Sequence, residues 1–527
     1  MRCLVRERHN RAKHSFSIDT AHIDLVLDEA KLTVEDIDTV ALTSTQNYEM
    51  VSDNKDTLSI VPEPHPQCNA PSTLQDLLDQ ANISVKDRLT ENVLSAIYDN
   101  DNPSESHRSL FPEWKHYDRL KLGVTGYLNG YCDSPNWEEG RGLEDIASFD
   151  FSEAAALEEG RMGFHYPFTV YLHGRAIPAY VIQHHAAHAA SCYYTSGFRQ
   201  SAVMTHDGAY FKTGPNNGMI FYADKHRLFP ITPNHLAIGH LYEQVGIFLG
   251  FGALGSAGIL MGLAPYRTPK FFDPRFVGNS HDWNKKEIFD PLQDWLGHCV
   301  KKATKMGYDL SCLGNTKRIL EPACVDIAAS TQKLFEEIII AAAECTSKLF
   351  KNIEMPMENL CYAGGTALSC PTNSRLHQES SFKNIYIPPD CDDSGLSIGC
   401  ALYLYHNILD NPLPSNDEAS SHLNSYPYLG GDFKGEALQV ALRAVADRVC
   451  VTQPDNWAHT AAEDIHEDKI VAWFEGRSEI GPRALGHRSL LASPRKKENW
   501  KRVNALKSRE DWRPFAPAVL EEDYKKF

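Results

Sequence analysis

The sequence has no apolar run long enough to span a bilayer, no closely spaced cysteine pair and no excess of basic residues. A membrane-spanning helix needs about 20 consecutive, mostly apolar residues, and the 527-residue chain contains no such run. The formal net charge of −17 is opposite to the basic footprint that general nucleic-acid binding requires. We therefore expect neither a membrane nor nucleic acid among the partners.

The cysteine pattern predicts a reducing environment. Thirteen cysteines are present, but none forms a C-x-x-C pair. Several lie within apolar runs, where a free cysteine behaves as a small buried hydrophobic residue; these are Cys192, Cys345, Cys361 and Cys400. Because disulfides are rare in reducing compartments, we expect a cytoplasmic protein. Apolar residues make up 42% of the chain and charged residues 23%, as in ordinary globular proteins.

The length predicts two domains, because one hydrophobic core rarely serves so many residues. From residue 178 onward, strand-like and helix-like patterns alternate, which is typical of an α/β fold whose sheet is covered by helices. Among them, residues 325–350 and 436–449 predict helices and residues 469–474 predict a strand. Residues 200–224 carry two strand patterns around an Asp-Gly turn and predict a hairpin. Residues 409–430 are polar and rich in Pro, Ser and Asn, and predict a linker. The expected domains are 1–425, with a loop-rich insertion at 46–165, and 431–527.

Two histidines four residues apart stand in the segment HHAAHAAS. On a helix His184 and His188 lie on one face, one turn apart, where two imidazoles can bind one metal ion. A carboxylate would complete a common ligand set, and Asp393, at an expected helix start, is the best candidate. The alternative is that both histidines are satisfied core residues and that Asp393 is an N-cap. Taken together, the three residues favour a metal site.

Two glycine turns follow buried strands: Asp207-Gly208 in THDGAY and Gly364-Gly365 in AGGTALS. Backbone N–H groups at such turns bind phosphate, and glycine lets the ligand approach closely. Most turns of this kind have no ligand. Here one lies in a hairpin and the other precedes a helix, and together they predict a nucleotide held between two lobes.

A basic segment near the end of the chain contrasts with its acidic remainder. Residues 483–513 hold ten Lys or Arg and only three Asp or Glu. A solvated surface is the usual explanation of such a run. Here Gly, Pro, Trp and Phe are interleaved with the basic residues, which indicates partial burial, and a buried arginine needs an anionic partner. Given the overall charge, the segment predicts a site for a small phosphate-bearing substrate.

These motifs together resemble the O-carbamoyltransferase family, which includes nodulation-factor carbamoyltransferases and antibiotic-tailoring enzymes. The similarity is carried by HHAAHAAS, MGLAPY, AGGTALSCPTNSRL, DDSGLSIGCAL and, most specifically, GRSEIGPRALGHRSLL with NALKSREDWRPFAP. It implies a large actin-like ATPase lobe, similar to the tRNA threonylcarbamoyl transferase subunit, and a smaller α/β lobe resembling threonylcarbamoyl-adenylate synthase. It also implies that ATP and carbamoyl phosphate form a carbamoyl adenylate, whose carbamoyl group passes to a hydroxyl of a small natural product or oligosaccharide.

The resemblance implies roles for individual residues. The ligands of a divalent metal, Fe²⁺ in this family, match His184, His188 and Asp393. The ATP-binding segments match Asp207, Gly208, Gly364, Gly365 and Asn373, and a lysine near the adenylate matches Lys13. The basic positions expected to hold carbamoyl phosphate match Arg483, Arg488, Lys507 and Arg513. For the base that takes the proton of the acceptor hydroxyl, the neutral imidazoles of His14 and His206 are the candidates.

The chain also departs from the family pattern. Family members begin with a strand hairpin and continue past RPFAP, whereas this sequence resembles a chain that starts after the hairpin and stops at Phe527. The family's charged DEGK stretch is replaced by the uncharged residues 256–259. We therefore expect a truncated smaller lobe. Two alternatives stay open: a catalytically impaired relative that binds nucleotide, and a relative of the tRNA threonylcarbamoylation enzymes. A homodimer is left open as well.

Overall fold

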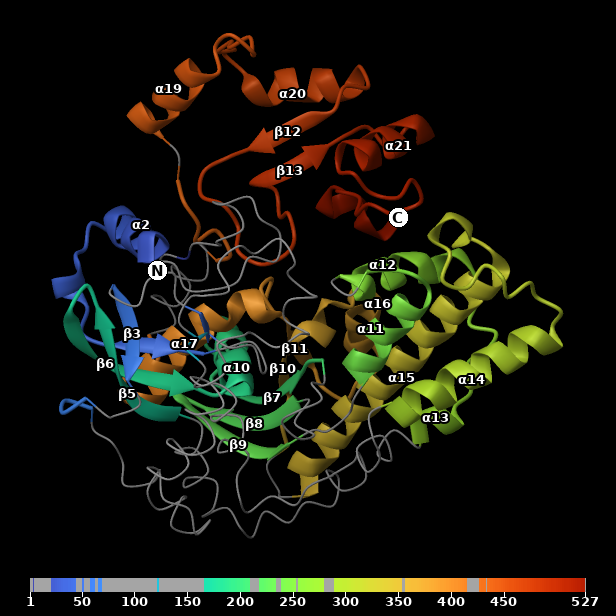
Figure 1. Cartoon of the computed structure of the whole chain (residues 1–527), viewed down its shortest axis with the longest axis horizontal. Helices are drawn as coiled ribbons and strands as arrows, with labels where there is room; N and C mark the ends of the chain where they lie inside the picture. Colours follow the sequence, from blue (N-terminus) through green and yellow to red (C-terminus); the bar gives the residue numbers. More distant parts are fainter. Residues whose placement is uncertain are drawn as a thin grey trace. The chain divides into compact units, whose positions relative to one another are not determined.

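The computed structural model divides the chain into two compact units, each with α/β character (Figure 1). The larger unit comprises residues 1–427 and 480–482, and the smaller one 428–479 and 483–527. The structure describes residues 3, 20–43, 50–51, 57–61, 65–68, 121–122, 165–208, 218–233, 238–252, 255–278, 289–352, 356–414, 426–432 and 434–526. Most of the predicted insertion at 46–165 and residues 415–425 of the predicted linker lie outside this described part.

The first sheet of the larger unit has the strand order β1-β6-β5-β3. Its strands are β1 (Val40–Leu42), β3 (Leu58–Val61), β5 (His165–Leu172) and β6 (Arg175–Ile182). Strands β5 and β6 form an antiparallel hairpin whose turn residues, His173 and Gly174, have φ angles of 48° and 83°. Positive φ at both turn positions matches the right-handed twist of the strands. Before this sheet lie helix α2 (Thr20–Ala30) and the short turn η1 (Val34–Asp36). A separate two-stranded pair is formed by β2 (Met50–Val51) and β4 (Lys121–Leu122).

The second sheet has the order β11-β10-β7-β8-β9, with an antiparallel half and a parallel half. Its strands are β7 (Gln200–His206), β8 (Gly218–Asp224), β9 (Arg227–Pro233), β10 (Asn359–Ala363) and β11 (Asn384–Tyr386). Strands β7 and β8 pair in register from Gln200–Asp224 to His206–Gly218, which confirms the predicted hairpin. Six of the seven residues of β7 are buried, so this central strand is covered on both faces.

Helix α10 (His184–Thr195) joins the two sheets along the chain and is buried over nearly its whole length. It packs against strands β7 to β10 and against helix α17 (Leu396–Tyr403), which in turn packs against β1. A Cβ atom added to Gly399 of α17 would lie 1.9 Å from the carbonyl oxygen of Ala187. The two helices therefore touch backbone to backbone in the turn between His184 and His188.

The remaining helices of the larger unit gather beside the second sheet (Figure 1). They are α11 (Ile238–Phe248), α12 (Ser256–Leu263), α13 (Arg275–Gly278), α14 (Phe289–Lys305), α15 (Pro322–Asn352) and α16 (Cys370–Glu379). The long α15 packs against α11, α12, α16 and β7, as the long apolar pattern at 325–350 predicted. Among the described residues, no helix combines the length and the apolar character needed to cross a membrane.

The smaller unit is built around a two-stranded antiparallel ribbon of β12 (Val471–Phe474) and β13 (Arg488–Leu491). Its helices are α19 (Gly435–Ala444), α20 (Trp457–His466) and α21 (Lys497–Leu506), followed by the turn η10 (Glu521–Lys526). The amphipathic patterns at 436–449 and 469–474 predicted α19 and β12, and both elements are present. The sequence did not predict that residues 480–482, between the two strands, belong to the larger unit.

Candidate metal centre

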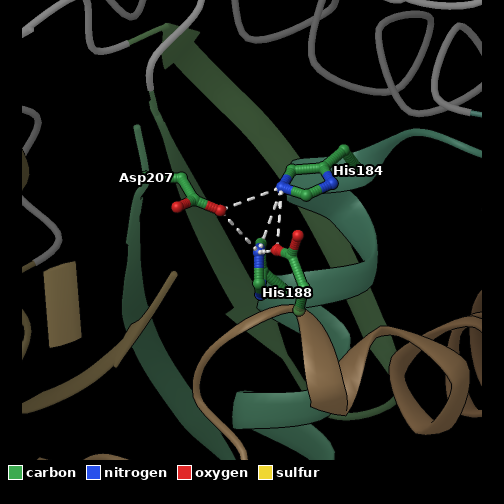
Figure 2. Close-up of side chains that lie close together, drawn as sticks. His184, His188 and Asp207 are labelled. Carbon is green, nitrogen blue, oxygen red and sulfur yellow. Dashed lines mark hydrogen bonds and ion pairs between the residues drawn. The ribbon is translucent and has the colours of Figure 1, made fainter. Parts of the chain in front are cut away.

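Helix α10 brings two imidazoles together at its N-terminal end. Gln183 caps the helix, and its side-chain oxygen accepts a hydrogen bond of 2.8 Å from the amide of Ala186. With the helix start fixed in this way, His184 and His188 lie one turn apart on the same face, with their Nε2 atoms 3.1 Å apart (Figure 2). Both rings are buried, with exposed fractions of 3% and 0%.

Asp207 lies directly after β7 and points at the same two nitrogens (Figure 2). Its Oδ2 is 3.1 Å from Nε2 of His184 and 3.2 Å from Nε2 of His188. Its Oδ1 accepts hydrogen bonds from the amides of Gly208, at 2.8 Å, and of Gly365, at 3.2 Å. One carboxylate oxygen is thus held by the backbone while the other faces the histidines, so the orientation of the group is fixed.

Asp393 completes the cluster from the turn η8 (Asp393–Gly395) before α17. Its Oδ1 is 3.3 Å from Nε2 of His188 and 3.7 Å from Nε2 of His184. Its side chain is 42% exposed, the most open of the four. The N-cap at this turn is the neighbouring Asp392, whose side chain accepts from the amide of Ser394 at 3.3 Å. The alternative of Asp393 as an N-cap is therefore wrong.

The four side chains fit a divalent cation. The ligand atoms of His184, His188, Asp207 and Asp393 all lie within 4.8 Å of one another. Metal–ligand bonds of about 2.1 Å place neighbouring ligand atoms roughly 3.0 Å apart in an octahedron and roughly 3.4 Å apart in a tetrahedron. The measured separations of 3.1–3.7 Å fall close to this range. A set of two imidazoles and two carboxylates suits iron, manganese or zinc.

The charges of the cluster favour a bound cation. Burial lowers the pKa of His188, but the hydrogen bonds that its imidazole donates to Asp207 and Asp393, and the charges of these carboxylates, outweigh burial and raise the pKa to about 9. Burial opposes ionisation of Asp207, yet both imidazoles stabilise its carboxylate and hold its pKa well below the ordinary value. Two carboxylates that face two buried imidazoles thus stabilise a positive charge in the site, either a proton on an imidazole or a bound metal ion.

The sequence predicted Asp207 in a phosphate-facing hairpin and did not predict that it lies beside the histidines. In the structure Asp207 is the fourth member of a group of side chains that could hold a metal ion. The signal available in the sequence was an aspartate directly after the last residue of a fully buried strand. The amide of Gly365, expected to face phosphate, donates to Asp207, and a Cβ on Gly364 would lie 2.1 Å from the carbonyl oxygen of His206. These glycines bring β10 against the end of β7.

The other predicted residues are not brought into the cluster. Asn373 lies in α16, where its Nδ2 donates to the carbonyl of Ala367 at 2.7 Å. His206, a candidate base, is the last residue of β7 and is fully buried. Gly208 is the last residue of a described stretch, and its amide donates to Asp207; a Cβ atom added there would meet none of the described residues within 4 Å. Lys13 and His14 lie outside the described residues.

A second cluster of charge lies in the smaller unit. Burial lowers the pKa of Lys507, and the charge of Arg509 lowers it further. Burial also lowers the pKa of Arg513, with Arg509 and Arg483 adding repulsion. Within the described part of the chain, the carboxylate paired with Arg513 is that of Glu510, 3.4 Å away. The predicted residues Lys507 and Arg513 are therefore near Arg509, and Arg483 is near Arg513. Arg509 was not among the predicted residues, although it stands in the same motif.

Arg488, the fourth predicted basic residue, is engaged elsewhere. Its guanidinium lies over the ring of Phe474 at 3.4 Å from the ring centre. It also donates hydrogen bonds to the backbone carbonyls of Glu475, at 2.8 Å, and Gly476, at 3.1 Å. Through these contacts Arg488, the first residue of β13, connects this strand to the end of β12.

Comparison with known proteins agrees with the motifs. A family model described as "Carbamoyltransferase N-terminus" matches residues 1–402, and one described as "Carbamoyltransferase C-terminus" matches residues 462–527. The chain belongs to the carbamoyltransferase family. The metal cluster falls within the N-terminal match, and the basic cluster falls within the C-terminal one.

Curated proteins with similar sequences are named for nodulation or for carbamoyl transfer. Nodulation protein NolNO of Sinorhizobium fredii is 32% identical over 352 residues, which are 66% of this chain and 48% of that protein. Nodulation protein NolO of Bradyrhizobium diazoefficiens is 32% identical over 354 residues, which are 66% of this chain and 60% of that protein. A 3'-hydroxymethylcephem-O-carbamoyltransferase of Amycolatopsis lactamdurans is 34% identical over 182 residues, which are 33% of this chain and 30% of that protein. The chain spans about half the length of the first curated relatives it matches.

Among solved structures, HypF of T. kodakarensis aligns with 44% of this carbamoyltransferase-family chain and 37% of its own, with a TM-score of 0.22 and 13% identity. A similarity this low does not establish a shared fold.

Metal affinity should depend on pH through His188. A metal ion binds the neutral imidazole, so it must displace the proton that His188 holds below pH 9 in the metal-free protein. We expect the apparent affinity to rise by up to about tenfold per pH unit from pH 6.5 to 9. Calorimetric titration with Zn²⁺ in two buffers of different ionisation enthalpy should show about one proton released per metal ion.

The stability of the metal-free protein should decrease over the pH range in which metal affinity increases. A raised histidine pKa stabilises the fold fully below the ordinary value of 6.5, and this contribution is lost as the pH rises through about 9. The melting temperature of the metal-free protein should therefore fall over this window, and Zn²⁺ should restore it. Asp393→Asn removes one of the two carboxylates and should move the window to lower pH. A metal affinity that is constant from pH 6.5 to 9 would contradict the assignment.

Proposed function

We propose that this protein transfers a carbamoyl group from carbamoyl phosphate, by way of a carbamoyl adenylate formed with ATP, to a hydroxyl of a small natural product or oligosaccharide. Family membership supports carbamoyl transfer, and a relative named for cephem O-carbamoylation supports a hydroxylated acceptor. The observation that carries the proposal is the convergence of four ligand atoms from α10, β7 and η8 on one point.

The metal centre is proposed to hold Fe²⁺ and to be the place of the transfer step. When bound, the metal would act as a Lewis acid that polarises the carbamoyl carbonyl. The chain's own residues supply the rest of the site. The backbone amides of Gly208 and Gly365 keep Asp207 in one orientation. The open side of Asp393 leaves room for the reacting groups next to the buried imidazoles.

The two units are proposed to bind different substrates. The larger unit would be the actin-like ATPase lobe that binds ATP near the turn at Gly364 and helix α16, and the smaller one would be the synthase-like lobe that binds carbamoyl phosphate. Water would cleave carbamoyl phosphate to carbamate and phosphate, and the carbamate oxygen would then attack the α-phosphorus of ATP and release pyrophosphate. Attack of the acceptor oxygen on the carbonyl of the adenylate would release AMP, and the hydroxyl proton would pass to a base. The proposal places this chemistry in the cytoplasm.

The basic cluster supports the role of the smaller unit. The side chain of Arg513 is only 14% exposed, and its carboxylate partner, Glu510, is 3.4 Å away. The pKa of Lys507 and of Arg513 is lowered by burial and by the charge of Arg509. Partly buried cations that repel one another are stabilised by an anion with several acceptor oxygens. A phosphate-bearing substrate has that chemistry.

Arg509→Ala should weaken anion binding and relieve repulsion at the same time. We expect about a tenfold loss of affinity for inorganic phosphate, since one charge-assisted contact is removed. Without phosphate, the variant should be at least as stable as the wild type, because the positive charge near Lys507 and Arg513 is lower. Calorimetry and thermal unfolding with and without phosphate measure both effects.

Arg443→Ala is the matched control, because this arginine lies on the exposed surface of α19 in the same unit. It should leave phosphate affinity unchanged. If Arg509→Ala and Arg443→Ala bind phosphate equally well, the cluster is not the anion site.

The whole activity is tested by incubating the protein with Fe²⁺, ATP, carbamoyl phosphate and a panel of hydroxylated acceptors. We expect AMP, pyrophosphate and an acceptor heavier by one carbamoyl group, detected by chromatography and mass spectrometry. Nucleotide binding without AMP formation, in calorimetry and product assays, would instead indicate a relative that binds nucleotide only. A mobility shift with tRNA at moderate salt would favour the tRNA-modifying relative.

A further inference from the structure

Residues Ile480–Pro482 lie in the SEIGPR motif, between the two strands of the smaller unit, yet they belong to the larger unit. Ile480 is fully buried, and its amide donates a hydrogen bond of 3.0 Å to the carbonyl of Pro427. The chain thus leaves the smaller unit after Glu479, is anchored in the larger unit for three residues, and returns at Arg483. An excursion this short needs a specific contact to hold it.

Gly481 makes that contact. Its φ angle is +85°, and a Cβ atom there would lie 2.4 Å from the carbonyl oxygen of Pro389 and 3.2 Å from Cα of Asp390. Both the backbone conformation and the space require glycine. The segment therefore packs backbone against backbone on residues 389–390, three residues before the metal-ligand candidate Asp393.

Asp390 also touches the turn that carries Asp393. A Cβ atom on Gly395 would lie 2.2 Å from the carbonyl oxygen of Asp390 and 2.8 Å from its Oδ2. Asp390 itself is fully buried, and its Oδ1 accepts a hydrogen bond from the hydroxyl of Tyr426. Asp390 is therefore in close contact with both Gly481 and the turn η8.

Asp393 depends on this support more than the other ligands do. The two histidines are fixed by a buried helix, and Asp207 by two backbone amides. Asp393 is 42% exposed and stands farthest from the imidazoles, at 3.3 and 3.7 Å. The position of Asp393 is set by the loop 389–395, which packs against Gly481. The same loop accepts a hydrogen bond of 2.7 Å from the amide of Gly364 to the carbonyl of Cys391.

We propose that Ile480–Pro482 is a strap that holds the loop of Asp393 in its ligating position, so that Gly481 is a positioning residue for the metal centre. This inference rests on the metal centre of the proposed function. It assigns the two halves of the motif to different tasks: the residues before Arg483 support the metal ligand, and Arg483 itself belongs to the basic cluster.

The test compares two alanine substitutions in the full chain. Gly481→Ala and Gly486→Ala both place alanine at a positive φ, +85° and +106°, so they carry a similar backbone cost. The new methyl group at Gly481 meets the backbone of residues 389–390, whereas no described residue lies within 4 Å of the corresponding position on Gly486. Co²⁺ is the probe: its affinity is measured by titration, and its visible absorption spectrum reports the coordination geometry.

We expect Gly481→Ala to bind Co²⁺ about tenfold more weakly than the wild type and with an altered spectrum, a magnitude typical of changes to groups that support a ligand. Gly486→Ala should match the wild type in both. Equal affinity and spectrum in the two variants would overturn the strap. Absence of Co²⁺ binding by the wild type would overturn the metal centre itself, and the strap with it.

Tyr426→Phe keeps the test valid if Gly481→Ala does not fold. It removes only the hydroxyl that donates to Asp390 and keeps the ring. We expect a loss of Co²⁺ affinity of about threefold and a spectral change in the same direction. A Tyr426→Phe protein with the affinity and spectrum of the wild type would then count against the strap.

Discussion

Replacing His188 with alanine is expected to reduce metal affinity by at least about 100-fold and to abolish carbamoyl transfer. The imidazole is wholly buried, and its Nε2 lies within 3.3 Å of the other three ligand atoms. Alanine leaves the cluster one nitrogen ligand short. Loss of outer groups alone typically costs 10–100-fold in metal affinity, so loss of a direct ligand should cost more. Metal content after dialysis and titration with Co²⁺ measure the effect.

His185→Ala is the matched control for that experiment. His185 is the next residue on the same helix and is equally buried, but its Nδ1 pairs with the hydroxyl of Thr205 at 3.1 Å and it is not among the four clustered ligands. Its loss should lower stability and leave one metal bound per chain. A His188→Ala protein that folds, by circular dichroism, and binds metal like His185→Ala would contradict the metal centre.

Gly399→Ala is expected to produce the largest loss of stability. The added methyl carbon would lie 1.9 Å from the carbonyl oxygen of Ala187, a backbone atom of a buried helix. Helices α10 and α17 must separate to admit it, and overpacking of this kind costs about 3 kcal/mol. Since α10 carries both histidines and the turn before α17 carries Asp393, metal affinity should fall as well. Denaturant unfolding with and without Zn²⁺ measures both.

Gly297→Ala provides the comparison. This glycine lies within helix α14, where an added methyl group would meet no atom of the described residues within 4 Å. Alanine favours a helix over glycine by about 1 kcal/mol, so this variant should be slightly more stable than the wild type. Equal unfolding midpoints for the two alanine variants would show that α10 and α17 do not pack as closely as the structure places them.

The sequence predicted the elements whose signals are local. The spacing of His184 and His188 was enough to place both on one helical face, because a helix repeats every 3.6 residues. The alternation around the Asp-Gly turn predicted the β7–β8 hairpin, and the apolar patterns predicted α15, α19 and β12. The motifs also predicted the family, which the matches over residues 1–402 and 462–527 confirm.

The sequence did not predict placements that depend on distant backbone. It placed Asp207 in a phosphate-facing hairpin but did not predict its position beside the histidines, where the amide of Gly365, 158 residues away, holds its carboxylate. Arg509 was passed over among ten basic residues of the segment, because a charge run does not reveal which side chains converge. The assignment of 480–482 to the larger unit rests on a contact with residues 389–390 that no local pattern records.

The sequence by itself determined the family, the α/β class, the histidine helix and the candidate Asp393, because helical spacing and motif identity are properties of short stretches. Only the tertiary structure decided that Asp207 lies beside the two histidines and Asp393, that Asp392 rather than Asp393 caps the turn, and that residues 480–482 pack in the larger unit next to residues 389–390. Those outcomes depend on which backbones approach within a few ångströms, and this is fixed by the packing of the whole unit.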